Sequence, residues 1–340
     1  MRNHEVTTVQ PLLDEQGALR EPGWSRQLYQ VYSRQQIQAR DWRIKEWDYY
    51  LVMNDRHGVA LTISDAGYIG MLSVTLLDFT QPWEHTETIL KLLPLGAYQL
   101  PADSNSGVSR YQDRRLLLEF TVSAGQRHLI CNCQSFKDNQ PFTCDITLRQ
   151  PAADTMVIAT PWANKPQAFY YNQKINCLPA SGRATWGEHE YVFKPTDAFG
   201  TLDWGRGVWT YDNTWYWSSG NAWINGRPFG FNLGYGFGDT TAASENMLFY
   251  DHRGHKLDDV VMHIPGDSYL KPWQITSSDD RFSAEFAPVL DRAARINLGV
   301  ILTDQHQVFG RLNGRAVLDD GKVLALRDIM CFAEHVRMKY

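Results

Sequence analysis

Residues 228–238 read Pro-Phe-Gly-Phe-Asn-Leu-Gly-Tyr-Gly-Phe-Gly, and this stretch decides the fold. After the first proline, its odd positions are apolar or aromatic, and its even positions are glycine apart from Asn232. Because successive side chains of a β-strand point to opposite faces, this alternation predicts a strand with one aromatic face and one nearly bare face. A bare face leaves room for a neighbouring ring, another backbone or a ligand.

The preceding segment is rich in aromatic residues of its own. Residues 202–221 read Leu-Asp-Trp-Gly-Arg-Gly-Val-Trp-Thr-Tyr-Asp-Asn-Thr-Trp-Tyr-Trp-Ser-Ser-Gly-Asn. Trp209, Trp215 and Trp217 hold odd positions, so an unbroken strand places them on one face. Two interpretations stay open. Either these tryptophans cover the glycines as ordinary packing, or the bare face and Asn232 line a pocket for a flat or lipophilic ligand, and a small barrel accommodates both.

The rest of the chain also alternates between β-rich segments and turn signals. Turn signals such as Asn225-Gly226 and Asn313-Gly314 separate β-rich runs, and only one short helix, over 26–39, is expected. This pattern predicts an all-β fold built as two consecutive antiparallel β-barrels or curled sandwiches. The strands are expected at 42–52, 59–63, 68–79, 115–122, 128–134, 142–148, 213–224, 228–238, 246–251, 257–264, 272–277, 281–287, 293–303, 307–313 and 322–337.

The segment from Lys194 to Leu202 is the expected seam between the two barrels, because Pro195, Asp197 and Gly200 interrupt the strand pattern there. We therefore divide the chain into 1–200, an N-terminal barrel domain with an irregular arm, and 201–340, a C-terminal barrel domain.

Composition narrows the class of protein and its compartment. The chain has 340 residues, of which 43% are hydrophobic, so it can bury a large core. Its net charge of −5 argues against nucleic acid as a partner. No apolar leader follows Met1 and no apolar run is long enough to span a membrane, so neither a secretory signal nor an integral membrane segment is expected. Five cysteines at irregular spacing favour a reduced, cytoplasmic protein without disulfides.

Charged residues beside the tryptophans are the candidate catalytic groups. Asp203 and Arg206 flank Trp204, and glycines on both sides of Arg206 allow a bend that aims its guanidinium inward. An Asp203–Arg206 pair that fixes the barrel mouth is the structural alternative. A carboxyl group enclosed by tryptophans would have the raised pKa that a general acid needs at neutral pH. We expect Asp203 or Glu245 as the acid and Arg206 as the orienting cation. The expected ligand-binding residues are Trp204, Trp209, Trp215, Trp217, Asn221, Asn232 and Tyr235.

Metal and cofactor signals are weak. No Gly-x-Ser-x-Gly, Walker or His-Glu-x-x-His motif occurs, and the glycine spacing of 234–238 does not match a dinucleotide motif. His85, His252 and His255 lie in segments that solvated loops explain at least as well as a metal site. The sequence therefore predicts neither a metal nor a cofactor.

Several motifs resemble an uncharacterised family, the domain of unknown function 2804. They include Asp203-Trp-Gly-Arg-Gly-Val-Trp209, Trp215-Tyr-Trp-Ser-Ser-Gly220, Gly230-Phe-Asn-Leu-Gly234 and Glu245-Asn-Met-Leu-Phe249, and the resemblance extends from Trp42 to the closing Phe332-Ala-Glu334. The tryptophan and glycine pattern is also loosely similar to proteins built from two lipocalin-like barrels. These include carotenoid hydratases, tocopherol cyclases and fungal Diels–Alder-type cyclases. The resemblance implies two lipocalin-like barrels and long apolar substrates that are protonated or cyclised without a cofactor.

Three functions follow as hypotheses. The first is an enzyme that binds a lipophilic small molecule in an aromatic-lined cavity and hydrates, cyclises or isomerises it by acid–base chemistry. The second is a carrier of a lipid or pigment, which needs the cavity but no acid. The third is a carbohydrate-active protein, because tryptophans and paired carboxylates also suit sugar rings. A raised carboxyl pKa inside the cavity separates the first hypothesis from the second.

Overall fold

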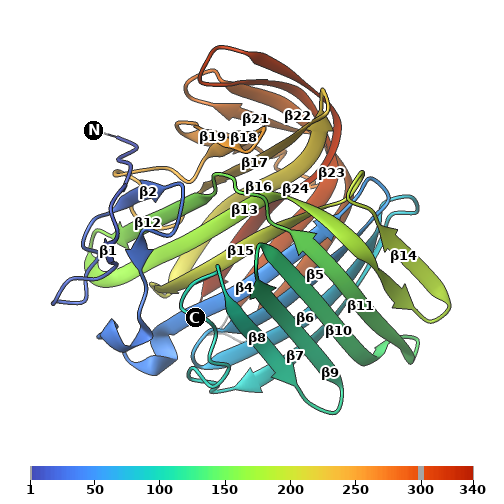
Figure 1. Ribbon diagram of the computed structural model, residues 1–340, viewed down its shortest axis with the longest axis horizontal. Helices are drawn as coiled ribbons and strands as arrows, with labels where there is room; N and C mark the ends of the chain where they lie inside the picture. The colour runs from blue at the N-terminus through green and yellow to red at the C-terminus, as the bar shows by residue number, and fades with distance from the viewer. Residues whose placement is uncertain (1, 298–301, 340) are drawn as a thin grey trace.

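The computed structural model describes residues 2–297 and 302–339, and strands dominate it (Figure 1). The helical elements in this part of the chain are two 3₁₀ turns, η1 (Arg34–Gln36) and η2 (Asp41–Arg43). The short helix expected over 26–39 is therefore wrong. The segment stays mostly extended because Tyr32 and Arg34 both reach Glu46, at 2.8 and 2.5 Å. No helix in the described ranges is long and apolar enough to cross a bilayer.

The first sheet is antiparallel and has thirteen strands. Its main path runs β7-β6-β5-β4-β15-β13-β11-β10-β9-β8, and the sheet curls until β7 lies against β10. The strands of this path are β4 (Ile44–Met53), β5 (His57–Asp65), β6 (Ile69–Asp78), β7 (Trp83–Leu92), β8 (Gly107–Gln112), β9 (Leu116–Ser123), β10 (Gln126–Lys137), β11 (Gln140–Arg149), β13 (Lys165–Trp186) and β15 (Phe199–Val208). Beside it lie β2 (Gly23–Ser25), β12 (Met156–Trp162) and β14 (His189–Phe193), while β1 (Gln10–Pro11) and β3 (Gln30–Val31) form a separate parallel pair.

The second sheet is also antiparallel and has nine strands in the order β19-β18-β17-β16-β24-β23-β22-β21-β20. It curls so that β17 approaches β20. Its strands are β16 (Asp212–Ile224), β17 (Arg227–Tyr235), β18 (Met247–Tyr250), β19 (Arg253–Lys256), β20 (Val260–His263), β21 (Trp273–Ser277), β22 (Phe282–Asn297), β23 (Leu302–Val317) and β24 (Val323–Lys339). The prediction of an all-β fold with two curled antiparallel sheets is confirmed.

The Asn-Gly pairs predicted a turn correctly at one position, between two strands, and wrongly at another, inside a strand. Asn225 and Gly226 both have positive φ and close the β16–β17 hairpin as expected. The expected turn at Asn313-Gly314 is wrong, because both residues lie within β23. A Cβ on Gly314 would stand 2.2 Å from the Ser283 carbonyl oxygen, so this glycine permits close approach of β22.

The chain changes sheets after β15, between Val208 and Asp212. β15 pairs with β4 and β13 along its whole length, so it belongs to the first sheet. The proposed division at residue 200 concerns folding units and stays a prediction; the change of sheet comes later in the chain.

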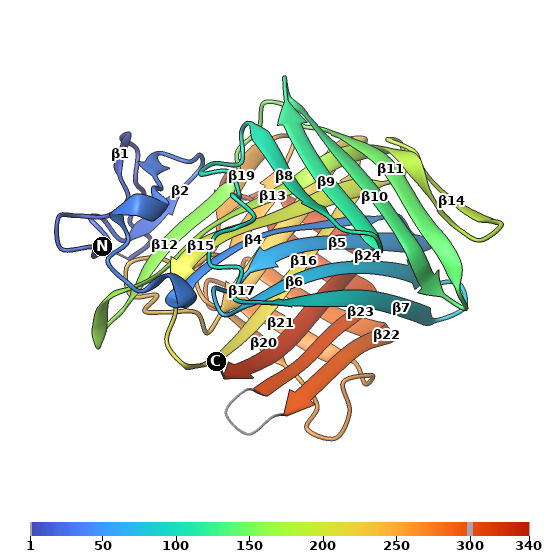
Figure 2. The same cartoon turned by 90° about the horizontal axis from the view of Figure 1, so that it is seen from below.

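The two sheets pack against each other and enclose four buried clusters. One apolar cluster fills each curled sheet, and two more join strands of both sheets. Figure 2 shows β4–β7 of the first sheet lying across β22–β24 of the second. Tyr49 and Leu51 of β4 meet Phe309 of β23 and Phe332 of β24 in one of the shared clusters. Buried polar residues gather between these two shared clusters.

Candidate functional site

Strand β15 separates two different buried environments. Leu202, Trp204 and Val208 pack into the apolar interior of the first sheet. The alternate positions face the second sheet, and they include Asp203 and Gly205. A Cβ on Gly205 would stand 1.9 Å from the Trp47 ring, so glycine is required for this indole to lie across the strand. The two faces of one strand thus carry the two halves of the predicted site.

Arg206 lies on the first-sheet face and is fully buried. Its guanidinium pairs with Asp48 at 3.1 Å and Glu46 at 3.9 Å, and it donates to the Pro101 carbonyl at 2.8 Å. The expected Asp203–Arg206 pair is therefore wrong. Residues three apart on a strand point to opposite faces, so the two side chains cannot meet. Trp204 follows Arg206 into the first sheet, where the guanidinium carbon lies 4.2 Å from its ring centroid.

Asp203 faces the second sheet and pairs with a lysine that the sequence analysis missed. Its carboxylate lies 2.8 Å from the ammonium of Lys174, its register partner on β13, and accepts a 2.5 Å hydrogen bond from Asn172. The Lys174 nitrogen also lies 3.9 Å from the centroid of the Trp217 ring on β16. The ion pair thus lies within the first sheet, and the contact of Lys174 with Trp217 joins it to the second sheet. Lys174 was missed because it sits in a polar run, Tyr171-Asn-Gln-Lys174, which does not look like a buried strand.

Glu245 reaches the same place from the segment that follows β17. Its Oε1 lies where a side chain on Gly234 would stand, 2.6 Å from the Cβ position, so the bare strand face accommodates this carboxyl group. Its main-chain carbonyl accepts a 2.7 Å hydrogen bond from Asn232, whose own oxygen accepts one of 2.7 Å from Trp217 Nε1. Asn232 is thereby fixed between Trp217 and the Glu245 backbone.

The Glu245 carboxyl is chemically unusual. Burial raises its pKa above the ordinary value, an effect that Asp203 reinforces and that Lys174 and Lys256 oppose. The Tyr170 hydroxyl hydrogen-bonds to it, whereas Oε2 has no hydrogen-bond partner among the described residues. Asn172 Oδ1, beside Asp203, is a second buried acceptor without a partner in this part of the chain. Buried polar atoms left in this way are uncommon in proteins.

Glu334 of β24 is a second acidic residue, and it was not among the predicted site residues. It lies opposite Trp217 across the β16–β24 pair and accepts hydrogen bonds from Trp215 Nε1 at 2.9 Å and Gln307 Nε2 at 3.1 Å. Burial raises its pKa to about 7, although the Trp215 bond and the positive charge of Lys174 act in the opposite direction. The signal available in the sequence was a carboxylate directly after the apolar run Ile329–Ala333.

Aromatic rings form a wall beside these acids. Phe237 contacts Trp209, Trp215 and Tyr170, with centroid separations of 4.7, 5.1 and 4.6 Å. Trp47 stacks on Tyr170 at 6.2 Å. The strand parity placed Phe237 with the apolar face of β17, and this is wrong. Strand β17 ends at Tyr235 and Gly236 adopts a φ of 96°, which turns Phe237 toward the first sheet.

The remaining predicted residues lie apart from the acids. Asn221 donates a 2.8 Å hydrogen bond to Thr201 and accepts one of 2.8 Å from the Cys177 amide, so it ties β16 to the first sheet. Tyr235 stacks on Tyr216 within the second sheet, at 4.6 Å. Of the ten predicted site residues, the structure brings six together beside the acids and leaves Trp204, Arg206, Asn221 and Tyr235 elsewhere. The six are Asp203, Trp209, Trp215, Trp217, Asn232 and Glu245.

We call the group of Tyr170, Asn172, Lys174, Asp203, Trp217, Glu245 and Glu334 the interface cluster. Water still touches its acids: Asp203 and Glu245 each retain 8% of their surface and Glu334 retains 5%. The cluster is therefore nearly dry, and the electrostatic interactions inside it are strong. No group of three or more potential metal ligands is arranged for a metal within residues 2–297 and 302–339.

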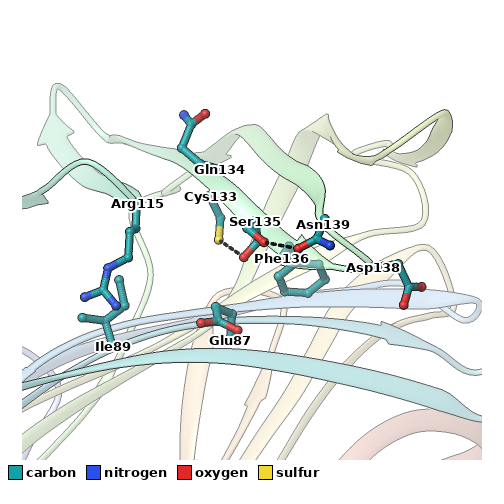
Figure 3. Close-up of a pocket in the computed structure, with 9 residues that line it drawn as sticks. All are labelled: Glu87, Ile89, Arg115, Cys133, Gln134, Ser135, Phe136, Asp138 and Asn139. Atoms are coloured by element: carbon teal, nitrogen blue, oxygen red, sulfur yellow. Dashed lines mark hydrogen bonds between the residues drawn. The ribbon is translucent and has the colours of Figure 1, made fainter.

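A separate cavity of about 370 Å³ opens where β7 faces β10 (Figure 3). Ile89, Cys133 and Phe136 form its apolar part, and Glu87 and Arg115 lie at its rim. Burial raises the pKa of the Cys133 thiol, which keeps it protonated and weakly nucleophilic. None of the predicted site residues lines this cavity, and it lacks the acidic groups of the interface cluster.

Comparison with known proteins places the chain in a family. Residues 3–340 match the domain of unknown function (DUF2804), and the chain belongs to this family. A comparison with curated proteins gave no match.

Solved structures share the fold at very low sequence identity. CghA, solved with Sch210972, has a TM-score of 0.53 at 10% identity over 87% of this chain and 88% of its own. Kievitone hydratase from Nectria haematococca has a TM-score of 0.50 at 10% identity, with the same coverage of 87% and 88%. A protein described as AttH from Nitrosomonas europaea scores 0.52 at 11% identity over 87% of this chain and 93% of its own. The fold of two lipocalin-like half-barrels is thus confirmed.

Proposed function

We propose that this protein binds a lipophilic small molecule between its two sheets and performs cofactor-independent acid–base chemistry on it, with Glu245 as the proton donor. The observation that carries the proposal is the Glu245 carboxyl: it is buried, its pKa is raised by burial, and its Oε2 has no partner among the described residues. A carboxyl group whose pKa is raised by burial and that keeps a free oxygen is suited to donate a proton.

The other residues of the interface cluster and the aromatic wall beside it have separate roles in the proposed reaction. Protonation of an alkene, or of a hydroxyl that leaves as water, creates positive charge on the substrate. The electron-rich faces of Trp209, Trp215 and Tyr170 would stabilise that charge. Loss of the proton leaves Glu245 as a carboxylate, which Lys174 stabilises. In cyclisation or isomerisation the proton returns to it from the adjacent carbon of the substrate, and in hydration it returns from the water that has added to the substrate. Hydration, cyclisation and isomerisation all share this first step.

Asp203 and Arg206 take roles that differ from the sequence-based expectation. Asp203 forms an ion pair with Lys174, so we assign it the role of holding that cation in place rather than donating a proton. Arg206 belongs to the first-sheet interior and has no part in the proposed chemistry. Glu334 is a second acid, held by Trp215 and Gln307 on the opposite side of Trp217.

The test is mass spectrometry of small molecules that co-purify with the native protein and are released by denaturation. Three proteins are compared: the wild type, Glu245→Gln and the exposed control Glu188→Gln. We expect an apolar compound in all three, with the unreacted form accumulating in Glu245→Gln. The same compound in the same form in all three would support a carrier without catalysis and reject Glu245 as the acid. Binding of only polar compounds would reject the lipophilic ligand.

A carbohydrate ligand is the second candidate, because the structure adds polar groups beside the aromatic wall. Asn172, Lys174 and Gln307 join Asn232 there, whereas the sequence offered Asn232 alone on the bare strand face. Sugar rings need several hydrogen-bonding partners as well as an aromatic surface. We rank this candidate second because Lys174 and Gln307 already bond to Asp203 and Glu334.

A further inference from the structure

Lys256, the last residue of β19, is a half-buried lysine that the proposed chemistry does not use. Its ammonium donates three hydrogen bonds: to Ser244 Oγ at 2.6 Å, to the Asn246 carbonyl at 3.0 Å and to the Leu257 carbonyl at 2.7 Å. Two of these acceptors belong to the residues immediately before and after Glu245. One side chain therefore bonds to the Ser244 hydroxyl before the proposed acid and to the Asn246 backbone after it.

Other bonds show that this short segment is anchored rather than merely folded over the sheet. The Gly234 amide donates to Asn246 Oδ1 at 2.7 Å, and Asn246 Nδ2 donates to the Asp258 carbonyl at 2.8 Å. The Ser244 amide donates to Asn3 Oδ1 at 3.1 Å. Residues 244–246 lack strand pairing of their own, because β18 begins only at Met247. Hydrogen bonds that involve side chains thus supplement the backbone bond of this stretch, which the Leu257 amide donates to the Asn246 carbonyl at 3.0 Å.

Enclosing a lysine ammonium in this way is costly, because desolvation lowers the pKa of Lys256 to about 7. Arg2 acts in the same direction, whereas Asp258, Asp279 and Glu245 oppose the shift, and none of these carboxylates lies within ion-pair distance of the Lys256 nitrogen in the described ranges. A methionine would fill the same space without the desolvation penalty. The position of the three acceptors explains why a lysine is present. They converge on one nitrogen, and only a lysine ammonium supplies three hydrogen-bond donors at the end of an unbranched chain.

We infer that Lys256 is a positioning residue for Glu245: its ammonium clamps Ser244 and Asn246 and so holds the carboxyl group over Gly234, within reach of Tyr170 and Lys174. The inference rests on the proposed function only in treating Glu245 as the acid. The clamp itself is a statement about the segment 244–246 and is tested without substrate.

The experiment compares the wild type with Lys256→Met, Lys256→Arg and the control Lys322→Met. Lys322 is an exposed lysine near the same sheet, whose ammonium contacts Tyr250 rather than the Glu245 segment. Hydrogen–deuterium exchange is followed by mass spectrometry over 239–247. The titration of the glutamate carboxyl carbons is followed by ¹³C NMR, with Glu245→Gln and Glu334→Gln used for assignment.

We expect Lys256→Met to accelerate exchange over 239–247 at least tenfold, because the segment is freed. We also expect it to displace the titration of Glu245, because the variant lacks the Lys256 charge that lowers this pKa and the freed segment admits water. Glu334 should keep its titration, and Lys256→Arg should restore slow exchange in part. Unchanged exchange in Lys256→Met would overturn the inference, as would an equal shift of Glu245 and Glu334, which would indicate a general loosening. Failure of the proposed function is a separate result: Glu245→Gln would then leave the co-purifying compound unaltered, whatever Lys256 does.

Discussion

Two buried ionic clusters lie on opposite faces of β15, and they differ in how completely their charges are paired. On the first-sheet face, Arg206 contacts both Asp48 and Glu46, and Arg34 closes the group with a 2.5 Å contact to Glu46. On the interface face, Lys174 pairs with Asp203, while Glu245 and Glu334 keep raised pKa values because of burial. In the first group each carboxylate has an arginine beside it, although Arg206 Nε and Arg34 Nη2 have no hydrogen-bond partner among the described residues. The second holds two acids that can exchange protons.

The largest effect is expected from breaking the structural cluster. Arg206→Met leaves Asp48 buried without its cation and Glu46 with Arg34 alone, and removing one partner of a buried pair costs about 3–5 kcal/mol. We expect that loss in the free energy of unfolding, measured by urea denaturation at pH 7. Arg183→Met, which removes a solvent-exposed pair with Glu190, is the control and should leave the free energy of unfolding nearly unchanged. Equal costs would show that the Arg206 cluster is not structural.

The next effect is a pH dependence of stability that comes from Glu334. Its folded pKa is raised to about 7 from 4.5, so the folded state binds more protons than the unfolded state between these values. The resulting stabilisation is fully present below pH 4.5 and is lost as the pH rises through 7, a change of about 3 kcal/mol. We expect Glu334→Gln to remove this slope when urea unfolding is compared at pH 5 and pH 8. A variant with the wild-type slope would refute the assignment.

Asp203→Asn tests the interface cluster, and we expect it to lower the free energy of unfolding by less than Arg206→Met does. It leaves Lys174 without its carboxylate, but Glu245 or Glu334 can ionise and take over the pairing. We therefore expect a loss of about 1–2 kcal/mol, less than for Arg206→Met, and a lower Glu334 pKa in ¹³C NMR. A loss as large as that of Arg206→Met, with no change in the Glu334 titration, would mean that the two clusters are equivalent.

Gly234→Ala should have the smallest effect on the free energy of unfolding, but it should clearly change the titration of Glu245. The new methyl group would overlap the Glu245 carboxyl, which lies at the end of a flexible side chain and can move aside. We expect a cost of about 1 kcal/mol or less, with a displaced Glu245 titration in ¹³C NMR. Gly266→Ala, which has open space around the added carbon, is the matched control. An unchanged Glu245 titration in Gly234→Ala would show that the carboxyl does not lie over this glycine.

The alternation of side chains along β17 and the aromatic face of β16 could be predicted from the sequence, because the side to which a strand residue points depends only on its position in the strand. The same rule separates Asp203 from Arg206, and their nearness in sequence concealed this. Glu245 was predicted from its motif, whereas Lys174 and Glu334 required knowledge of which strands face each other across the two sheets. A sequence does not show that pairing, since β13 and β24 lie about 150 residues apart and meet only through packing of the two curled sheets.

The central claim is that the interface cluster holds protonated carboxyl groups at neutral pH. Infrared difference spectroscopy of the wild type, Glu245→Gln and Glu334→Gln at pH 7 tests it directly, because a protonated carboxyl has a C=O stretch well separated from that of a carboxylate. We predict a protonated carboxyl band in the wild type that loses intensity in Glu245→Gln, and part of it also in Glu334→Gln. A wild-type spectrum without such a band, or one that Glu245→Gln leaves unchanged, would contradict the account.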